Sequence, residues 1–207
     1  MGRCPKKPVI VFEGIEGSGK SYHLNNVSNF LKRKKIKHIV IREPGGSKNS
    51  EKIRDFILNK NINFHNLTDL FLYLSARNEN YNSILKKNFK KKIILIDRFT
   101  DSTIAYQHFG MGLNLKIINL LNSYILKDFK ASFSFLNTVS TKNLKLRLKK
   151  RKRLNRYDKF NSKFYSKVQK GYFKIFSKRK NYMIIDSNLP INANKKIIIN
   201  KILDLIS

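Results

Sequence analysis

Two glycines, a lysine and a serine near the N-terminus have the types and spacing that suit phosphate binding. An apolar run at residues 9–12 is followed closely by Gly14, Ile15, Glu16, Gly17, Ser18, Gly19, Lys20 and Ser21. This run matches G-x-x-x-x-G-K-[ST], in which glycines let backbone N–H groups surround phosphate oxygens at the start of a helix. We expect Lys20 to reach the β- and γ-phosphates and the Ser21 hydroxyl to bind Mg²⁺. The chain is therefore predicted to bind a nucleoside triphosphate.

A second apolar run, at residues 93–96, ends in an acid and an arginine, Asp97 and Arg98. An acid at the carboxyl end of a strand is often only a structural feature, but beside a phosphate loop it is typical of the Mg²⁺-side carboxylate. We expect Asp97 to face Ser21 across the phosphates, directly or through a water molecule. The Arg98 guanidinium could then bridge the donor and acceptor phosphates.

The elements that must position these residues alternate between apolar strands and helices. We expect strands at residues 9–12, 38–41, 93–96, 132–136 and 183–185. We expect helices at residues 20–35, 50–59, 68–88, 101–109, 115–126, 141–150, 164–180 and 194–206. This order predicts an α/β fold, with a five-stranded parallel sheet flanked by helices on both faces and ligands beyond the carboxyl ends of its strands. No repeat or linker interrupts residues 1–207, so we expect one domain.

Composition narrows the class of protein further. No stretch approaches the roughly 18 apolar residues of a membrane span, and the N-terminus lacks the apolar segment of a signal peptide. The one cysteine, Cys4, fits a reducing compartment, so we expect a cytoplasmic protein without a membrane partner. The net charge of +31 is of the kind that suggests a nucleic-acid partner. However, the lysines are spread along the chain beside many Asn and Ile, the residues of A/T-rich codons, so we expect no specific nucleic acid.

Further motifs follow along the chain. Residues 42–46 read R-E-P-G-G, residues 97–107 match D-R-[YH]-x-x-S-[TN]-x-A-Y-Q, and residues 185–190 match I-D-[AG]-x-x-P. In the type and order of these motifs, the chain resembles bacterial thymidylate kinases from about residue 10 to residue 190. The resemblance implies the P-loop NTPase fold, transfer of the γ-phosphate of ATP to dTMP, Mg²⁺ as cofactor, and a homodimer. The apolar faces of residues 67–74 and 113–126 could form the dimer interface, or could equally belong to the core.

The resemblance also implies roles for individual residues. The positions that match the family's dTMP site are Glu43, Pro44, Arg54, Tyr73, Arg77, Arg98, Ser102, Thr103, Tyr106 and Gln107. Among them, Arg54 would hold the acceptor phosphate and Tyr106 would crowd the 2′ position of the sugar. Glu16 would orient the acceptor and join Ser21 and Asp97 in organising Mg²⁺. Lys20, Arg98 and Glu16 would then be catalytic.

A basic segment at about residues 149–163 resembles the lid of the family. Gly17 follows Glu16 where some family members carry an arginine, which implies that the lid supplies the cations that meet the transferring phosphoryl group. The arginines available are Arg147, Arg151, Arg153 and Arg156, of which Arg151 and Arg153 are the leading candidates. Without the resemblance, this segment would be interpreted as a solvated charged loop.

Two other functions remain open from the residues. A P-loop kinase for another deoxynucleotide or a deoxynucleoside is one, and a nucleic-acid-stimulated ATPase, suggested only by the charge, is the other. The chain departs from the family pattern at Tyr22, Phe99 and Asn155, of which Tyr22 could crowd the phosphate loop. The sequence does not distinguish dTMP from dUMP.

Overall fold

Five parallel strands form one sheet in the computed structural model, which describes residues 7–150 and 155–207. The strands are β1 (Val9–Glu13), β2 (His38–Arg42), β3 (Ile93–Asp97), β4 (Phe133–Thr138) and β5 (Tyr182–Asp186), in the order β2-β3-β1-β4-β5. Each neighbouring pair is parallel, with Val9 opposite Ile94 and Ile10 opposite Phe133. The predicted five-stranded parallel sheet is confirmed.

Helices connect successive strands. The α-helices are α1 (Lys20–Arg33), α2 (Lys48–Leu58), α3 (Asn66–Asn80), α4 (Lys86–Asn88), α5 (Thr100–Thr103), α6 (Leu115–Leu126), α7 (Thr141–Lys149), α8 (Ser162–Phe176) and α9 (Ile191–Ile206). Two π-helical segments, η1 (Tyr81–Leu85) and η2 (Ile104–Gly110), continue α3 and α5, and η3 (Arg156–Lys159) is a short 3₁₀ helix.

Some element bounds differ from the prediction. Helix α2 begins two residues before the predicted start, because the Ser47 side chain accepts a hydrogen bond from the Ser50 N–H and caps it. The basic segment at 149–163 includes η3, where Asn155 and Asp158 form a reciprocal capping box. Capping by single polar side chains thus determines where these helices begin, which the pattern of apolar residues alone did not predict.

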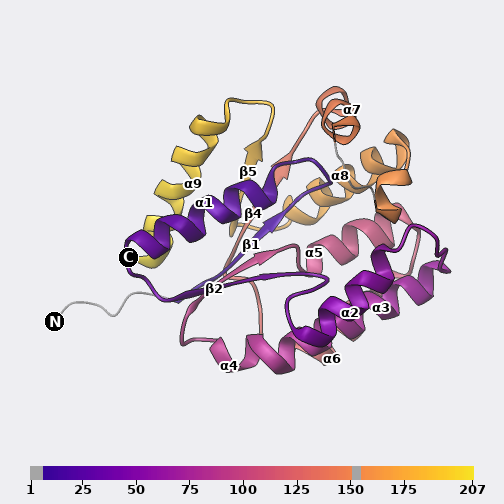
Figure 1. Ribbon diagram of the computed structural model, residues 1–207, viewed down its shortest axis with the longest axis horizontal. Coiled ribbons are helices and arrows are strands. Elements are labelled where there is room, and N and C mark those ends of the chain that lie inside the picture. Colours follow the sequence, from indigo (N-terminus) through magenta and orange to yellow (C-terminus); the bar gives the residue numbers. More distant parts are fainter. Residues whose placement is uncertain (1–6, 151–154) are drawn as a thin grey trace.

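The sheet is covered on both faces, as Figure 1 shows, with α1 and α9 on one side and α4 and α6 on the other. Alternate residues of β1 face opposite layers. Ile10 and Phe12 pack with residues of α1 and α9, whereas Val9 and Val11 pack with Leu85 of η1 and with other residues on that side. Because both faces are buried, the central strands β1 and β3 are apolar runs that each end in an acid.

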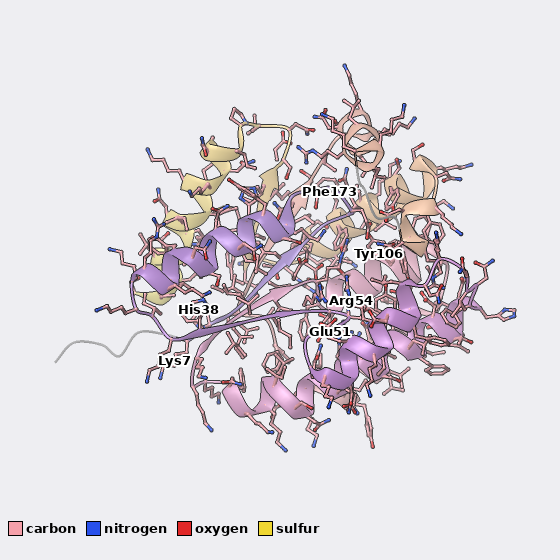
Figure 2. All side chains as sticks on the ribbon, in the orientation of Figure 1. Lys7, His38, Glu51, Arg54, Tyr106 and Phe173 are labelled. Carbon is pink, nitrogen blue, oxygen red and sulfur yellow. The ribbon has the colours of Figure 1, made fainter. Side chains whose placement is uncertain are left out.

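A third cluster of buried side chains brings α8 against η2 beside the sheet. It includes Tyr106 of η2, Tyr157 of η3 and Tyr165 and Tyr172 of α8. Figure 2 shows Arg54 and Tyr106 at the opposite end of the sheet from Lys7 and His38, which lie where β1 and β2 begin. The polar residues predicted to bind substrate therefore lie at the carboxyl ends of the strands.

Within the described part of the chain, no helix is long and apolar enough to cross a membrane.

Candidate active site

The phosphate loop joins β1 directly to α1. Gly14, Gly17 and Gly19 have φ angles of 136°, 65° and 83°, a region that L side chains rarely adopt. At Gly14 a Cβ atom would also lie 2.2 Å from the Asn137 carbonyl oxygen, so no larger residue fits there. The first N–H groups of α1 have no partner within the helix, which makes this turn a site for an anion.

Lys20 lies at the floor of this loop and is only 6% exposed. Its Nζ donates a hydrogen bond to the Ile15 carbonyl oxygen at 2.9 Å, and it forms no ion pair among the described residues. Burial, and next the charge of Arg98, lower the pKa of Lys20 to about 8. The charges of Asp97, Glu16 and Glu13 oppose this shift, and an anionic phosphate in the loop would add to them.

The predicted metal residues divide into two groups. Strand β3 ends beside the phosphate loop, and the Ser21 hydroxyl donates a hydrogen bond to the Asp97 carboxylate. Glu16 lines the same cavity as these two residues but has other partners: it accepts hydrogen bonds from Arg98, at 2.8 Å, and from the Tyr106 hydroxyl. Burial acts to raise the pKa of Glu16, but the cations Arg98 and Lys20 outweigh it and the pKa is lowered. Glu16 is therefore an ionised partner of Arg98 on the acceptor side of the loop.

Arg98 spans the two halves of the site. Its backbone is left-handed, with φ of 67°, and its guanidinium donates to the Gly14 carbonyl oxygen at 2.7 Å. The guanidinium also lies 5.1 Å from the centre of the Tyr106 ring. The side chain thus reaches from the phosphate loop to η2, the position from which it could contact both phosphates.

A cavity of about 280 Å³ joins the phosphate loop to the acceptor side. The cations that line it are Lys20, Arg42, Arg54, Arg98 and Arg147. Arg42 is paired with Glu51 at 2.7 Å, but Arg54 has no ion pair among the residues described and donates to the Pro44 carbonyl oxygen at 2.6 Å. Burial, and next the charge of Arg42, lower the pKa of Arg54. We call this space the phosphate cavity, since its excess of cations suits polyphosphate.

A smaller cavity of about 30 Å³ lies beside it and collects most of the predicted acceptor residues. Its lining is Glu16, Glu43, Tyr73, Arg77, Arg98, Phe99, Ser102, Thr103, Tyr106, Gln107 and Tyr157. Ligand pockets usually measure about 300–1,000 Å³, so a pyrimidine ring could enter only if part of this wall moved. Tyr73 and Tyr157, whose ring centres lie 6.0 Å apart, line both cavities.

Arg77 holds the inner wall of the smaller cavity in place. It is 2% exposed, and its Nε donates to Glu43 at 2.7 Å. Its Nη1 donates to Thr103 at 3.0 Å and to Asn122 at 2.6 Å. Burial raises the pKa of Glu43, although Arg77 opposes this shift. This buried hydrogen-bond network forms the polar inner wall of the smaller cavity.

The structure separates the arginines of the basic segment. Arg147 donates to the carbonyl oxygens of Gly17, at 2.7 Å, and Ser187, at 2.6 Å, on the donor side. Arg156 instead pairs with Asp69 of α3, which also accepts a hydrogen bond from Tyr157 at 2.5 Å. The leading candidates, Arg151 and Arg153, lie outside the described residues.

Several residues at the site were missed by the sequence reasoning. Tyr157 lines both cavities, and Asp69 holds it there. Glu13, fully buried at the end of β1, binds the start of α5. The one local signal for Glu13 was a charged residue closing an apolar strand, the same signal that identified Asp97.

The concern that Tyr22 crowds the phosphate loop is not supported, because its side chain is 44% exposed. Tyr22 contributes to a cavity of about 370 Å³ on the donor side, together with Arg147, Ser187 and Leu189. This cavity adjoins Gly17 and Gly19, so it extends the phosphate loop toward the end of β5.

A family model described as thymidylate kinase matches residues 12–198. The chain belongs to the thymidylate kinase family. It is 38% identical over 184 residues to a thymidylate kinase of Thermosipho africanus, covering 88% of this chain and 91% of the relative. It is 36% identical over 199 residues to a thymidylate kinase of Acholeplasma laidlawii, covering 94% and 98%.

Solved structures agree with this thymidylate kinase assignment. The crystal structure of thymidylate kinase from Ehrlichia chaffeensis superposes with a TM-score of 0.77 at 27% identity, covering 96% of this chain and 99% of that one. The resemblance drawn from the motifs and the predicted P-loop NTPase fold are thereby confirmed. The roles of individual residues stay predictions.

Proposed function

We propose that this chain transfers the γ-phosphate of ATP to dTMP, giving ADP and dTDP. Membership of the thymidylate kinase family supports this activity. The structural observation that supports the activity is the phosphate cavity. The loop lysine, Lys20, and the acceptor-side arginines, Arg54 and Arg98, line this one space. Donor and acceptor phosphates can therefore meet between them.

The chemistry needs little more than position and charge. The acceptor is a phosphate anion at neutral pH, so no general base is required. Lys20 and Arg98 would neutralise the charge that develops on the phosphoryl oxygens. The adjacent oxygens of Ser21 and Asp97 fit Mg²⁺, which favours a few protein ligands together with substrate phosphates. When bound, Mg²⁺ would neutralise further phosphate charge.

The acceptor separates this activity from its rivals. A deoxynucleoside kinase must activate a neutral hydroxyl, which would require an acid such as Glu43 to act as a base. Glu43 is instead buried in an ion pair with Arg77. Arg54, which bonds only a backbone carbonyl oxygen, is suited to an anionic acceptor. A coupled assay with dTMP, dUMP, CMP and thymidine tests the proposal, and we expect dTMP to be the preferred acceptor. Thymidine as the best acceptor would overturn it, as would ATP hydrolysis that depends on DNA or RNA.

We expect Arg54 to bind dTMP and not ATP. Replacing it with alanine is expected to raise the KM for dTMP by about 10–100-fold, because a charged hydrogen bond worth about 1.5–3 kcal/mol is lost. The KM for ATP should change little. Steady-state kinetics on Arg54→Ala, with the exposed Lys52→Ala of the same helix as control, measure both constants. Equal weakening for both substrates would show that Arg54 does not act on the acceptor alone.

A homodimer is the second part of the proposal. Helices α3 and α6 pack on each other through Leu70, Leu74 and Ile118. Their outer faces expose Phe71 (50%), Leu120 (69%) and Tyr124 (83%). So much exposed apolar surface on two packed helices is typical of a subunit interface.

Charges on that face should separate the subunits. Leu120→Glu with Tyr124→Glu is expected to weaken the dimer at least about 30-fold, the effect of losing about 2 kcal/mol at an interface. Sedimentation velocity over a range of concentrations measures the change. Leu203→Glu, on exposed surface of α9, is the matched control. An unchanged dimer would place the interface elsewhere, and a parent protein that is monomeric would contradict the proposal.

A single domain across residues 1–207 and a cytoplasmic location complete the proposal. The sheet supports the first, because its strands are drawn from residue 9 through residue 186. The second stays a prediction from composition.

A further inference from the structure

Glu13 is a fully buried carboxylate that the reaction described above does not use. It ends β1, and its Oε1 accepts hydrogen bonds from the backbone N–H groups of Phe99, at 2.8 Å, and Ser102, at 3.3 Å. Its Oε2 accepts from the Ser102 hydroxyl at 2.5 Å and from the Tyr172 hydroxyl at 3.2 Å. All these partners lie next to Arg98 in the chain or in contact with its guanidinium.

The backbone of Arg98 depends on this arrangement. Its φ of 67° is costly for a residue with a side chain, so the neighbouring structure must hold it. The Arg98 N–H donates to the Phe12 carbonyl oxygen at 3.0 Å, and Glu13 binds the next N–H along the chain. Two consecutive residues of β1, Phe12 and Glu13, therefore accept hydrogen bonds from the two consecutive N–H groups of the left-handed turn.

The Glu13 carboxylate also contacts the guanidinium of Arg98 indirectly, through two hydroxyl groups. Its Nη1 donates to the Ser102 hydroxyl and to the Tyr172 hydroxyl, each at 3.3 Å. Those two hydroxyls lie 2.7 Å apart, so that one can donate to the other, and both are within hydrogen-bond distance of Oε2 of Glu13. Burial, and next the charge of Asp101, raise the pKa of Glu13 to about 7, and in its ionised form Glu13 can only accept. It then holds the Ser102 hydroxyl proton in a hydrogen bond, which leaves the lone pairs of that hydroxyl for Arg98.

We propose that Glu13 is the positioning residue for Arg98, which sets the turn and the direction of the guanidinium that bridges the donor and acceptor phosphates. This inference rests on the proposed function, since its readout is the rate of dTMP phosphorylation. Glu13 touches neither substrate. It acts by fixing Arg98 before the substrates bind, so that little reorganisation is needed as the phosphoryl group moves.

A glutamine at this position would break the arrangement without changing its size. One oxygen could still accept from the two backbone N–H groups, but an NH₂ group would face the hydroxyls where an acceptor is needed. The negative charge behind the guanidinium would also be lost. We expect Glu13→Gln to lower kcat by about 10-fold or more.

A double-mutant cycle distinguishes positioning from general support of the fold. The proteins are the parent, Glu13→Gln, Arg98→Ala and the double variant, and kcat, both KM values and the Tm are measured for each. If Glu13 acts through Arg98, adding Glu13→Gln to Arg98→Ala should change kcat less than about 2-fold. The same 10-fold loss in both backgrounds would overturn the proposal, as would an unchanged kcat in the single variant.

The matched control is Asp101→Asn, another buried carboxylate at the start of α5. Asp101 pairs with Arg179 through two bonds of 2.6 Å and makes none to Arg98 in the described structure. Its loss should lower the Tm while kcat stays within about 2-fold of the parent. An equal loss of kcat in this control and in Glu13→Gln would show that any damage to α5 suffices, which contradicts the proposal.

If Glu13→Gln does not fold, Tyr172→Phe takes its place in the cycle. It removes one hydroxyl between Glu13 and Arg98 and leaves the carboxylate in position. We expect about a 3-fold loss of kcat that disappears in the Arg98→Ala background, and a loss that persists there overturns the proposal. A parent protein that does not phosphorylate dTMP would instead contradict the proposed function, before any variant is compared.

Discussion

Replacing Lys20 with alanine is expected to lower the kcat for dTMP phosphorylation by at least about 10²–10³-fold, the usual cost of one preorganised group at a developing charge. Lys20 is buried below the phosphate loop and bonds only one backbone carbonyl oxygen in the described structure. Its ammonium is therefore available to the β- and γ-phosphates. The fold should survive, because glycine turns surround this side chain and the large apolar clusters lie elsewhere.

The assay of Lys20→Ala combines steady-state kinetics with circular dichroism and a thermal melt. Lys32→Ala, an exposed position on the same helix, is the control for loss of a lysine from α1. A folded Lys20→Ala protein with near-normal activity would show that the loop does not act on the transferred phosphate.

Replacing Arg151 and Arg153 together with alanine is expected to lower kcat by at least about 10²-fold. Gly17 leaves the phosphate loop without an arginine, so the cation that meets the transferring phosphoryl group must come from another segment. Of the two described arginines that were grouped with the lid, Arg156 pairs with Asp69, and Arg147 lines the phosphate cavity with its guanidinium bonded to the carbonyl oxygens of Gly17 and Ser187. Arg151 and Arg153 stay the leading candidates from the sequence.

The pattern of the kinetic change identifies the role of this pair. A cation needed only as charge develops lowers kcat far more than it raises either KM, so dTMP binding should be nearly unchanged. Coupled-assay kinetics on the double variant, with Lys149→Ala plus Lys150→Ala as the matched control, separate a specific effect from loss of basic charge. A double variant as active as its parent would mean that these arginines belong to the general basic surface.

Much of the site could be predicted from the sequence because its parts are local. A phosphate loop is one strand, one turn and one helix start, and its glycines and lysine are consecutive residues. Parallel strands buried on both faces produce continuous apolar runs, and their carboxyl ends meet at one edge. Ser21 and Asp97 could therefore be placed together although 76 positions separate them.

Tertiary structure alone decided which charged groups pair. Arg156 was grouped with the lid arginines, but the packing of η3 on α3 gives it a carboxylate partner 87 positions away. Glu13 meets Tyr172 across 159 positions, and Arg77 meets Asn122 across 45. Burial makes an unpaired charge costly, so each of these groups takes the partner that packing brings within reach. That partner depends on how helices from distant parts of the chain are seated on the sheet, which no local pattern of residues encodes.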